Sequence, residues 1–430
     1  MLFIKKTPVE LSIILPVCNE EKNLAVLLPD LKKKLQACVK SFEIIVVDAG
    51  SKDNSVSIAS NLGAKVFVQK QKKFAAAIKE GIEASCGEYV ITLDADNSHP
   101  PELIRELIDA IKEADLVIAS RYIKGAVFRT NIFRRMGSQL LNKIFKYILS
   151  LSVNDLSSGF RIYRREVLKG IQIESQGFDI ELETLIKIIS AGWCVKEIPL
   201  SYKKRLFGRS KASWSNCVAF FKTCIRMYKL RNSILSGDYD DRASSSKLLL
   251  QRLWHKYKDR MAFEYVKKEA FSLDAGCGSG SFIQNFSNVV GLDTDMNKAR
   301  YLKRAKGLKN HIPLGSITDM PFKNETFEQV MCSEVIEHVP KVGRVFREFW
   351  RVLKPNGRLI ITTPDYGRPI WPFFEWFYHK AIPDGYADQH ISHYDYNELQ
   401  RLLKDNNFEI IDHRSFLGAI IILKAKKRGA

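Results

Sequence analysis

Hydrophobic and polar positions follow the same rhythm twice along this chain of 430 residues. Short apolar runs rich in β-branched residues end at polar side chains, and stretches with apolar residues three or four positions apart separate them. Runs of the first kind predict buried strands, and stretches of the second kind predict helices. In the N-terminal half the predicted strands are residues 11–17, 43–47, 89–93 and 116–120, with helices at 23–38 and 55–62. This alternation predicts a mostly parallel α/β sheet covered on both faces.

The alternation starts again in the C-terminal half, after a polar break. Residues 236–246 are small, polar and nearly free of aliphatic side chains, which is typical of a linker. Beyond them a predicted helix at 248–268 leads into predicted strands at 272–273, 289–292, 329–332 and 358–362, closed by a strand pair at 408–412 and 420–424. The chain is too long to fold around one hydrophobic core. We therefore expect two α/β domains, at 1–235 and 248–430, joined by the linker 236–247.

Positive charge is concentrated in one stretch of the N-terminal half. Between Arg121 and Leu235 there are 22 Lys and Arg against 7 Asp and Glu, so this stretch carries most of the net charge of +19. Such clustering favours anionic partners, namely phosphates, nucleic acid or acidic lipid headgroups, over a merely solvated face. No recognised RNA-binding module accompanies the stretch, so nucleic acid is not expected as a partner.

Cysteine usage and the lengths of the apolar runs bear on the compartment. The eight cysteines form no C-x-x-C pair and several lie inside apolar runs, which indicates buried thiols in a reducing compartment rather than disulfides or a zinc site. No apolar run approaches the ~18 residues of a membrane span, and residues 1–6 are too short for the core of a signal peptide. We therefore expect a cytoplasmic protein, with peripheral attachment to the inner face of a membrane left open.

Three carboxylates follow predicted strands in the N-terminal half. Asp48 comes directly after the predicted strand 43–47, and Asp94 and Asp96 come after the next predicted strand, 89–93. Ligands of such sheets bind at the carboxyl ends of the strands. Two carboxylates one residue apart can both face a divalent cation that bridges the oxygens of a diphosphate. A bare D-x-D is a weak signal, so its surroundings decide.

Those surroundings resemble the inverting glycosyltransferases of family 2 that include dolichyl-phosphate mannose and glucose synthases, which have a GT-A-like fold. The resemblance covers about residues 9–235. It is carried in order by the segments 15–21, 46–53, 94–102, 119–122, 134–138, 155–161 and 205–211. So many ordered segments make the resemblance highly specific. It implies a nucleotide-sugar donor and a polyprenyl or dolichyl phosphate as the acceptor.

The resemblance also implies roles for the matching residues. The family often has Gln where this chain has Ser98, and a second Asp where it has Ala49. A water molecule is therefore expected in place of a third protein ligand to the metal. The implied roles are contact with the base and ribose of the donor for Pro16, Glu20 and Asp48, and binding of Mg²⁺ or Mn²⁺ for Asp94 and Asp96.

Such an acceptor gives the basic stretch a chemical purpose. Arg134 and Ser138 lie four residues apart and so project from one face of a helix. Together with Arg121, Arg205 and Lys211 they are expected to form the pocket for the acceptor phosphate. A phosphate is already ionised, so no strong general base is required, in agreement with the absence of His between Arg121 and Lys211. The alternative is that these cations only pair with acidic neighbours.

Residues 214–228 predict an amphipathic helix. Its apolar positions are 214, 217, 218, 221, 224, 225 and 228, and Lys222, Arg226 and Lys229 fall on another face. A basic helix of this kind lies in a membrane interface or packs on its own domain. The two alternatives are about equal on the sequence, and the lipid acceptor favours the interface.

A glycine-rich loop follows the first predicted strand of the C-terminal half. Gly276, Gly278 and Gly280 follow Asp274 and allow a tight turn whose backbone amides reach a ligand. The spacing G-x-G-x-G differs from the G-x-G-x-x-G that is usual for a dinucleotide pyrophosphate. Asp293 ends the next strand, where a carboxylate can bind both hydroxyls of a ribose.

The order of these segments resembles class I methyltransferases that use S-adenosylmethionine and have a Rossmann-like fold. The resemblance covers about residues 248–425, and the segments 316–322, 333–338 and 353–359 also carry it. The resemblance implies Asp274, Gly276 and Gly278 at the methionine end, Asp293 at the ribose, Asp319 and Met320 beside the adenine, and Ser333 and Glu334 at the reaction centre.

The methyl acceptor is less well defined. His338, His390 and His393 are candidate bases if it is a hydroxyl, although His338 is equally well a structural turn residue. The spacing of His390 and His393 suggests a metal only weakly, since no Cys or carboxylate set beside them completes a site. The aromatic segment 370–378 caps an apolar acceptor, touches lipid or simply packs as a helix.

These patterns predict a bifunctional enzyme, peripheral at a membrane. A polyprenyl-phosphate glycosyltransferase using a donor of the GDP-mannose or UDP-glucose type is fused to a methyltransferase that acts on a glycan or lipid. The alternative keeps the glycosyltransferase and makes the second domain a scaffold or a non-catalytic sensor that binds S-adenosylmethionine.

Overall fold

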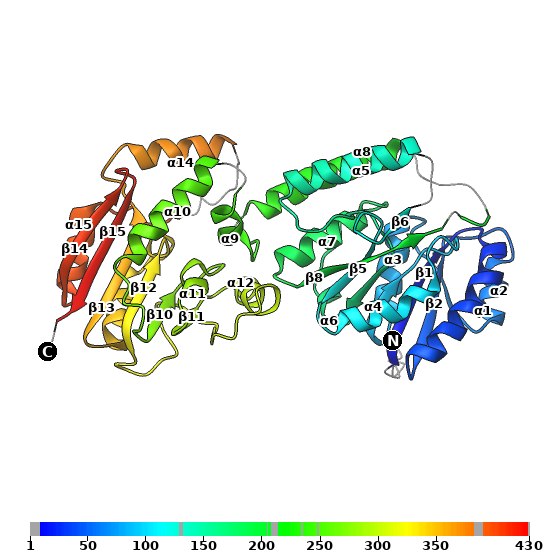
Figure 1. Ribbon diagram of the computed structural model, residues 1–430, viewed down its shortest axis with the longest axis horizontal. Helices are drawn as coiled ribbons and strands as arrows, with labels where there is room; N and C mark the ends of the chain where they lie inside the picture. The colour runs from blue at the N-terminus through cyan, green and yellow to red at the C-terminus, as the bar shows by residue number, and fades with distance from the viewer. Residues whose placement is uncertain are drawn as a thin grey trace. The chain divides into compact units, whose positions relative to one another are not determined.

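The computed structural model describes residues 9–128, 132–203, 205–207, 214–233, 235–246, 249–381 and 390–428. The side chains of residues 132–134, 214–215, 250 and 377–381 fall outside this description. The chain divides into two compact units (Figure 1). Unit 1 comprises 1–189 with 193–228, and unit 2 comprises 190–192 with 229–430.

Unit 1 is built on a seven-stranded sheet with the order β3-β2-β1-β4-β7-β5-β8. β1 is parallel to both β2 and β4, and β5 is parallel to β8, whereas β7 is antiparallel to its neighbours β4 and β5. The strands are β1 (Val9–Val17), β2 (Phe42–Asp48), β3 (Lys65–Val68), β4 (Gly87–Thr92), β5 (Leu116–Ser120), β7 (Arg161–Arg164) and β8 (Val195–Pro199). A small parallel pair joins β6 (Val127–Phe128) to β9 (Ser201–Tyr202).

Helices cover both faces of this sheet, which explains why its strands β1, β2 and β5 are mostly buried. Alternate residues of β1, such as Leu11 and Ile13, enter the larger core with Leu24, Leu28 and other residues of the flanking helices. The helices and turns are α1 (Glu21–Cys38), α2 (Ser55–Asn61), α3 (Phe74–Ala84), η1 (Pro101–Leu103), α4 (Ile104–Ile111), α5 (Ile132–Ile148), α6 (Arg165–Leu168), α7 (Ile180–Ser190) and α8 (Trp214–Arg231).

Close packing of α3 on β1 depends on one glycine. A Cβ on Gly81 would lie 2.4 Å from Cγ2 of Ile14, so any larger residue would push the helix away from the sheet. The sheet carries its site at the carboxyl ends of β1, β2 and β4. The helix therefore helps to fix the strand that stands in the middle of that edge.

Unit 2 is a six-stranded sheet with the order β11-β10-β12-β13-β15-β14. Four parallel strands are followed by the antiparallel pair that the sequence predicted at residues 408–412 and 420–424. The strands are β10 (Ser272–Ala275), β11 (Val289–Leu292), β12 (Phe327–Ser333), β13 (Leu353–Pro364), β14 (Phe408–Phe416) and β15 (Ile420–Lys427). Both units thus have the predicted α/β architecture, a GT-A-like sheet and a Rossmann-like methyltransferase sheet.

Helices flank the second sheet on both sides (Figure 1). Val345, Phe346 and Phe349 of one helix enter one core cluster, while Ile360 and Ile422 of the strands enter another on the opposite face. The helices are α9 (Tyr239–Ser244), α10 (Leu249–Phe263), α11 (Ser281–Asn285), α12 (Met296–Arg300), η2 (Tyr301–Ala305), η3 (Ile336–His338), α13 (Val342–Val352), α14 (Ile370–Ala381) and α15 (Tyr396–Asp405).

The predicted linker at 236–247 contains the short helix α9. Asp240 of this helix accepts a hydrogen bond from the backbone N–H of Ser279 (2.9 Å), which ties the segment to the glycine-rich loop. Among the described residues, no helix is both long and apolar enough to cross a membrane.

Candidate active sites

The loop after β4 holds Asp94 and Asp96 in different surroundings. Asp96 is only 6% exposed and accepts hydrogen bonds from the backbone N–H (3.0 Å) and hydroxyl of Ser98. Arg205 lies against the same carboxylate, with Nη2 2.6 Å from Oδ2. Burial alone would raise the pKa of Asp96, but the hydrogen bonds from Ser98 and the charge of Arg205 hold it below the usual range. Asp96 is therefore ionised at neutral pH.

Asp94 is more accessible, with 38% of its side chain exposed. Burial in the recess nevertheless raises its pKa, and the nearby charge of Asp96 adds to this effect. A divalent cation would reverse the effect, because it favours the charged form of both carboxylates. The two side chains therefore offer the oxygen ligands that Mg²⁺ or Mn²⁺ prefers.

His99 holds the backbone of this loop and was not assigned a role by the sequence. Its Nδ1 accepts a hydrogen bond from the backbone N–H of Asp94 (3.3 Å), and its Nε2 lies 3.9 Å from Oδ2 of Asp94. The ring is 3% exposed and stacks on Phe160 at 5.2 Å. Burial lowers the pKa of His99, so the ring is neutral at pH 7. Its position three residues after Asp96 was the only available signal.

The residues predicted to bind the nucleoside lie on adjacent strands. Pro16 of β1 pairs with Val47 of β2, and the next pair contains Asp48. Asp48 is buried and accepts hydrogen bonds from the backbone N–H groups of Gly50 and Ser51, both at 2.8 Å. Asp48 therefore shapes the loop after β2 as well as standing at the predicted site. Glu20 accepts a hydrogen bond from Nδ2 of Asn23 (2.6 Å) at the start of α1.

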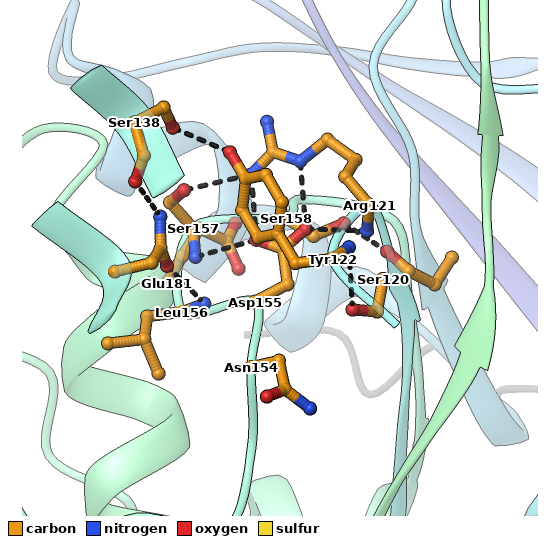
Figure 2. A network of polar contacts seen from close by, with 12 residues as sticks. Ser120, Arg121, Tyr122, Ser138, Asn154, Asp155, Leu156, Ser157, Ser158 and Glu181 are labelled. Atoms are coloured by element: carbon orange, nitrogen blue, oxygen red, sulfur yellow. Dashed lines mark hydrogen bonds and ion pairs between the residues drawn. The ribbon is translucent and has the colours of Figure 1, made fainter. Parts of the chain in front are cut away.

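Arg121 is held by a carboxylate that the sequence did not single out (Figure 2). Its Nε and Nη2 donate to the two oxygens of Asp155 at 2.8 and 2.7 Å, and Nη2 also donates to Ser157 at 2.9 Å. Beside it the hydroxyls of Tyr122 and Ser138 are 2.6 Å apart. The cluster thus joins the end of β5 to α5 and to the loop before β7.

Of the five residues predicted to bind the acceptor phosphate, the structure describes the side chains of three, Arg121, Ser138 and Arg205. Arg121 pairs with Asp155 and Arg205 with Asp96, which is the alternative that the sequence left open for these cations. The side chain of Arg134 and the whole of Lys211 lie outside the described residues. Ser138 faces the Arg121 cluster from α5 (Figure 2). The shared phosphate pocket remains a prediction.

A third carboxylate, on α7, lies close to Asp94. A Cβ built on Gly159 would be 3.6 Å from Oδ1 of Asp94 and 3.7 Å from Oε1 of Glu181, so the glycine separates the two acids. Nε of Arg161 lies 3.2 Å from Oε2 of Glu181. Burial raises the pKa of Glu181 to about 7, although Arg161 opposes this shift. The sequence gave no signal for Glu181, because only the fold brings α7 to this loop.

The glycine-rich loop of unit 2 requires its glycines at two positions. Gly276 has φ +79°, and a Cβ there would lie 2.5 Å from Val335. Gly278 has φ +53°, and its N–H donates to Oδ2 of Asp293 at 2.8 Å. Oδ1 of Asp293 accepts from the N–H of Asp295 at 2.9 Å. The predicted ribose ligand therefore also organises the loop.

A cavity of about 870 Å³ opens at the carboxyl ends of the parallel strands in unit 2. Residues 316–318 line it, next to Asp319 and Met320 in the chain, and Met320 is buried. The contact of Asp319 and Met320 with the adenine stays a prediction. The predicted residues that do line the cavity are Asp274, Gly276, Gly278, Asp293, Ser333, Glu334 and His338.

Two carboxyl groups in this cavity, Asp274 and Glu334, have pKa values shifted in opposite directions. Burial raises the pKa of Asp274 to about 8, so its carboxyl group is largely protonated at pH 7. Glu334 has φ +53°, and its Oε2 lies 2.5 Å from Nζ of Lys258, a buried lysine of α10. The charge of Glu334 raises the pKa of Lys258 against the effect of burial. The sequence did not identify Lys258, which is more than 70 residues from its partner.

Comparisons with known proteins agree with both sites. The description "Glycosyl transferase family 2" matches residues 12–171, and "Methyltransferase domain" matches residues 273–361. Residues of unit 1 are 32% identical to the polyprenol monophosphomannose synthase of Mycolicibacterium smegmatis over 219 residues, 47% of this chain and 81% of the relative. They are also 32% identical to the dolichol-phosphate mannosyltransferase of Pyrococcus furiosus over 234 residues, 52% of this chain but only 65% of that relative's length.

Solved structures resemble each half at low sequence identity. Glucosyl-3-phosphoglycerate synthase from Mycobacterium tuberculosis matches with a TM-score of 0.41 and 18% identity, covering 52% of this chain and 80% of the relative. A methyltransferase from Thermotoga maritima matches with a TM-score of 0.34 and 18% identity, covering 41% of this chain and 97% of the relative. Scores this low carry no argument about function. On the family matches and the sequence relatives, the chain is an enzyme that belongs to glycosyl transferase family 2 and carries a methyltransferase domain behind the glycosyltransferase unit.

Proposed function

We propose that unit 1 transfers a sugar from a nucleotide donor of the GDP-mannose or UDP-glucose type to a polyprenyl or dolichyl phosphate. The observation that supports this most is the 32% identity to two relatives named for mannosyl transfer to dolichol phosphate and for polyprenol monophosphomannose synthesis. The D-x-D loop at the carboxyl end of β4 adds the matching chemistry, since Asp96 is held in its ionised form.

The residues around the D-x-D loop fit a bound Mg²⁺ or Mn²⁺. Asp94 and Asp96 would hold the ion, which would neutralise charge on the departing nucleoside diphosphate. Arg205 now neutralises Asp96 at 2.6 Å. With the ion bound, Arg205 would be free to pair with a phosphate oxygen of the donor, because carboxylate and phosphate are anions of similar hydrogen-bonding geometry. His99 would hold the backbone of Asp94 in place.

The acceptor phosphate enters from the side of Arg121, Ser138 and Arg134. Asp155 fixes the guanidinium of Arg121 through two hydrogen bonds, so its orientation is set before the substrate arrives. A phosphate oxygen forms the bond to the anomeric carbon while the bond to the diphosphate breaks, and the electron pair leaves with the diphosphate. No proton has to be removed, because the attacking oxygen is already ionised.

Contact with a membrane would bring a lipid-linked acceptor to this side. The rings of Phe145 in α5 and Phe220 in α8 are 5.2 Å apart, so the two helices pack together (Figure 1). In α8 the predicted apolar positions divide. Cys224 is buried against the unit, whereas Phe221 is 57% exposed and Ile225 is 49% exposed. Part of the helix therefore packs on its own unit, and the exposed residues would supply a face for peripheral binding.

Unit 2 is proposed to bind S-adenosylmethionine in its 870 Å³ cavity and to transfer the methyl group to a glycan or lipid. The lining contains the glycine loop, Asp293 at the end of β11, and Ser333 and Glu334 after β12. The ion pair between Lys258 and Glu334 fixes the last of these at the reaction centre. The alternative scaffold role is disfavoured because the cavity and its glycine loop are intact.

One experiment tests both activities in the full chain. The purified protein is incubated with labelled GDP-mannose or UDP-glucose, Mg²⁺ or Mn²⁺ and a polyprenyl phosphate in detergent, and the organic extract is examined for a labelled glycolipid. Calorimetry on the same preparation measures binding of S-adenosylmethionine. Absence of a labelled lipid with every donor contradicts the first proposal, and absence of cofactor binding favours the scaffold.

A further inference from the structure

We propose that Glu337, His338 and His390 bind a divalent metal ion beside the methyl-transfer cavity, and that this ion holds a hydroxyl group of the methyl acceptor. One ligand atom from each residue lies within 4.8 Å of the other two. His338 also lines the cavity with Ser333 and Glu334, so a bound ion would face the reaction centre. The role assigned to the ion rests on the proposed methyltransferase activity, whereas the binding site itself does not.

The fold assembles the three residues from two distant segments. Glu337 and His338 belong to η3, the turn directly after β12. The backbone carbonyl of Glu337 accepts hydrogen bonds from the N–H groups of Ile391 and Ser392, both at 2.9 Å. These bonds fasten the segment after His390 to η3 and bring the two imidazole rings to a centroid distance of 5.0 Å. Glu337 is next to His338 in the sequence, but only the fold brings this carboxylate close to His390.

His390 has the support that a metal-binding histidine usually has. Its Nδ1 lies 3.1 Å from Oε1 of Glu375 and 2.6 Å from the hydroxyl oxygen of Tyr366. Tyr366 donates its own proton to Oε1 of Glu375 at 2.7 Å, so Nδ1 of His390 is the donor in its contacts. This tautomer leaves the lone pair on Nε2. A carboxylate on the second ring nitrogen is the common arrangement that orients a histidine toward a metal.

Glu337 supplies a second and independent indication. It is fully buried, and its Oε2 accepts a hydrogen bond from Thr363 at 3.1 Å. Its Oε1 is buried too, and among the described residues no group donates a hydrogen bond to that oxygen. Burying a carboxylate oxygen without a partner is costly. A bound cation would satisfy this oxygen.

The ligand set indicates both the class of metal and its use. Two imidazoles and one carboxylate suit Zn²⁺ or another first-row divalent ion, and three protein ligands leave coordination positions open for a substrate oxygen. A hydroxyl bound there loses its proton to solvent water more easily. Its oxygen then forms a bond to the methyl carbon while the carbon–sulfur bond breaks, and the electron pair stays on sulfur, which becomes a neutral thioether. The acceptor is therefore a hydroxyl compound, and His338 and His390 act as ligands rather than bases.

Metal binding to the full chain tests this proposal directly. Asp94→Asn and Asp96→Asn are introduced together to silence the first site, the protein is stripped with a chelator, and Zn²⁺ and Co²⁺ are added. Elemental analysis is expected to find one tightly bound ion per chain, and the Co²⁺ form is expected to show the visible absorption of a low-coordinate site. Glu337→Gln and His390→Gln are expected to lose that ion. Glu375→Gln should weaken binding by about 10- to 100-fold.

His393→Gln is the matched control. This exposed histidine is three residues from His390 and stacks on Tyr366 at 4.0 Å, but it lies outside the cluster. It should keep the ion. The proposal fails if the parent chain binds no ion, if both Glu337→Gln and His390→Gln keep it, or if His393→Gln loses it.

Thermal melting shows whether each variant is folded. If Glu337→Gln does not fold, the result for His390→Gln decides the test. Calorimetry with S-adenosylmethionine separates the two proposals. A chain that binds the ion but not the cofactor contradicts the methyltransferase activity alone. A chain that binds the cofactor but no ion contradicts the metal site alone.

Discussion

The two units place carboxylates at the same position of similar sheets but give them opposite electrostatic surroundings. In unit 1, Asp96 lies between the hydroxyl of Ser98 and the guanidinium of Arg205, and its pKa is lowered. In unit 2, burial raises the pKa of Asp274 to about 8. The first arrangement keeps a charged carboxylate ready for a cation, and the second leaves a carboxyl group that is largely neutral at pH 7. The strand ends provide the place, and the neighbouring side chains decide the charge of the carboxyl group.

The largest effect on activity should come from replacing Asp96, the carboxylate that is held in its ionised form. Asp96→Asn removes the charge that a metal ion requires but keeps the shape that Ser98 contacts. Glycosyl transfer should fall roughly a hundred- to a thousandfold, the usual loss when a preorganised electrostatic group is removed. Radiolabel transfer to lipid measures this, and binding of S-adenosylmethionine to the same protein is the control. Full activity in this variant would remove Asp96 from the metal site.

A second test distinguishes the roles of Arg134 and Arg205 in unit 1. A charge-assisted contact to phosphate contributes roughly 1.5–3 kcal/mol, so Arg134→Ala should weaken use of the lipid phosphate about 10- to 150-fold. Donor binding should be almost unchanged in that variant. Arg205→Ala should affect both substrates, because Arg205 also neutralises Asp96. Steady-state kinetics with each substrate varied in turn distinguishes the patterns. Equal loss of donor and acceptor binding in Arg134→Ala would assign this arginine to the donor instead.

The corresponding change in unit 2 is Asp293→Ala. It should weaken binding of S-adenosylmethionine by about tenfold to a hundredfold, the cost of losing a charged hydrogen-bond acceptor. Calorimetry on the full chain measures the affinity. Asp293→Asn keeps one acceptor oxygen for the N–H of Gly278 and should show a smaller loss. If the two variants behaved alike, the carboxylate would contribute charge rather than loop geometry.

The raised pKa of Asp274 predicts how the stability of unit 2 depends on pH. The ordinary pKa is 3.8 and the folded value is about 8, so the folded state keeps a proton that the unfolded chain releases in this window. Its contribution to stability is fully present below pH 3.8 and is lost as pH rises through about 8. The slope is at most about 1.4 kcal/mol per pH unit for one proton.

Asp274→Asn should flatten that profile without abolishing it, because Glu337 also has its pKa raised to about 8. Thermal unfolding of both proteins from pH 5 to pH 9 provides the comparison, with the transition of unit 1 as the internal reference. Parallel profiles in the two proteins would mean that Asp274 is ionised in the folded state, and the electrostatic contrast between the units would disappear.

The amino-acid sequence by itself determined the architecture and the local motifs of this protein. Apolar runs at 11–17 and 289–292 became β1 and β11, because a strand buried on both faces needs a continuous run of apolar residues. The D-x-D loop and the glycine-rich loop were identified for the same reason, since each is a local geometry specified by a few consecutive residues. The antiparallel β7, inserted between β4 and β5, did not show in the pattern.

The tertiary structure alone decided which charges meet and which groups lose contact with water. Arg121 meets Asp155, Glu181 approaches Asp94 across Gly159, and a carboxylate reaches His390 from a different turn. Met320 is buried in the core, which its place in the sequence did not indicate. Such pairings depend on distances between segments that are far apart in the chain, and the cost of burying a charge depends on everything packed around it. A linear pattern of residue types contains neither quantity.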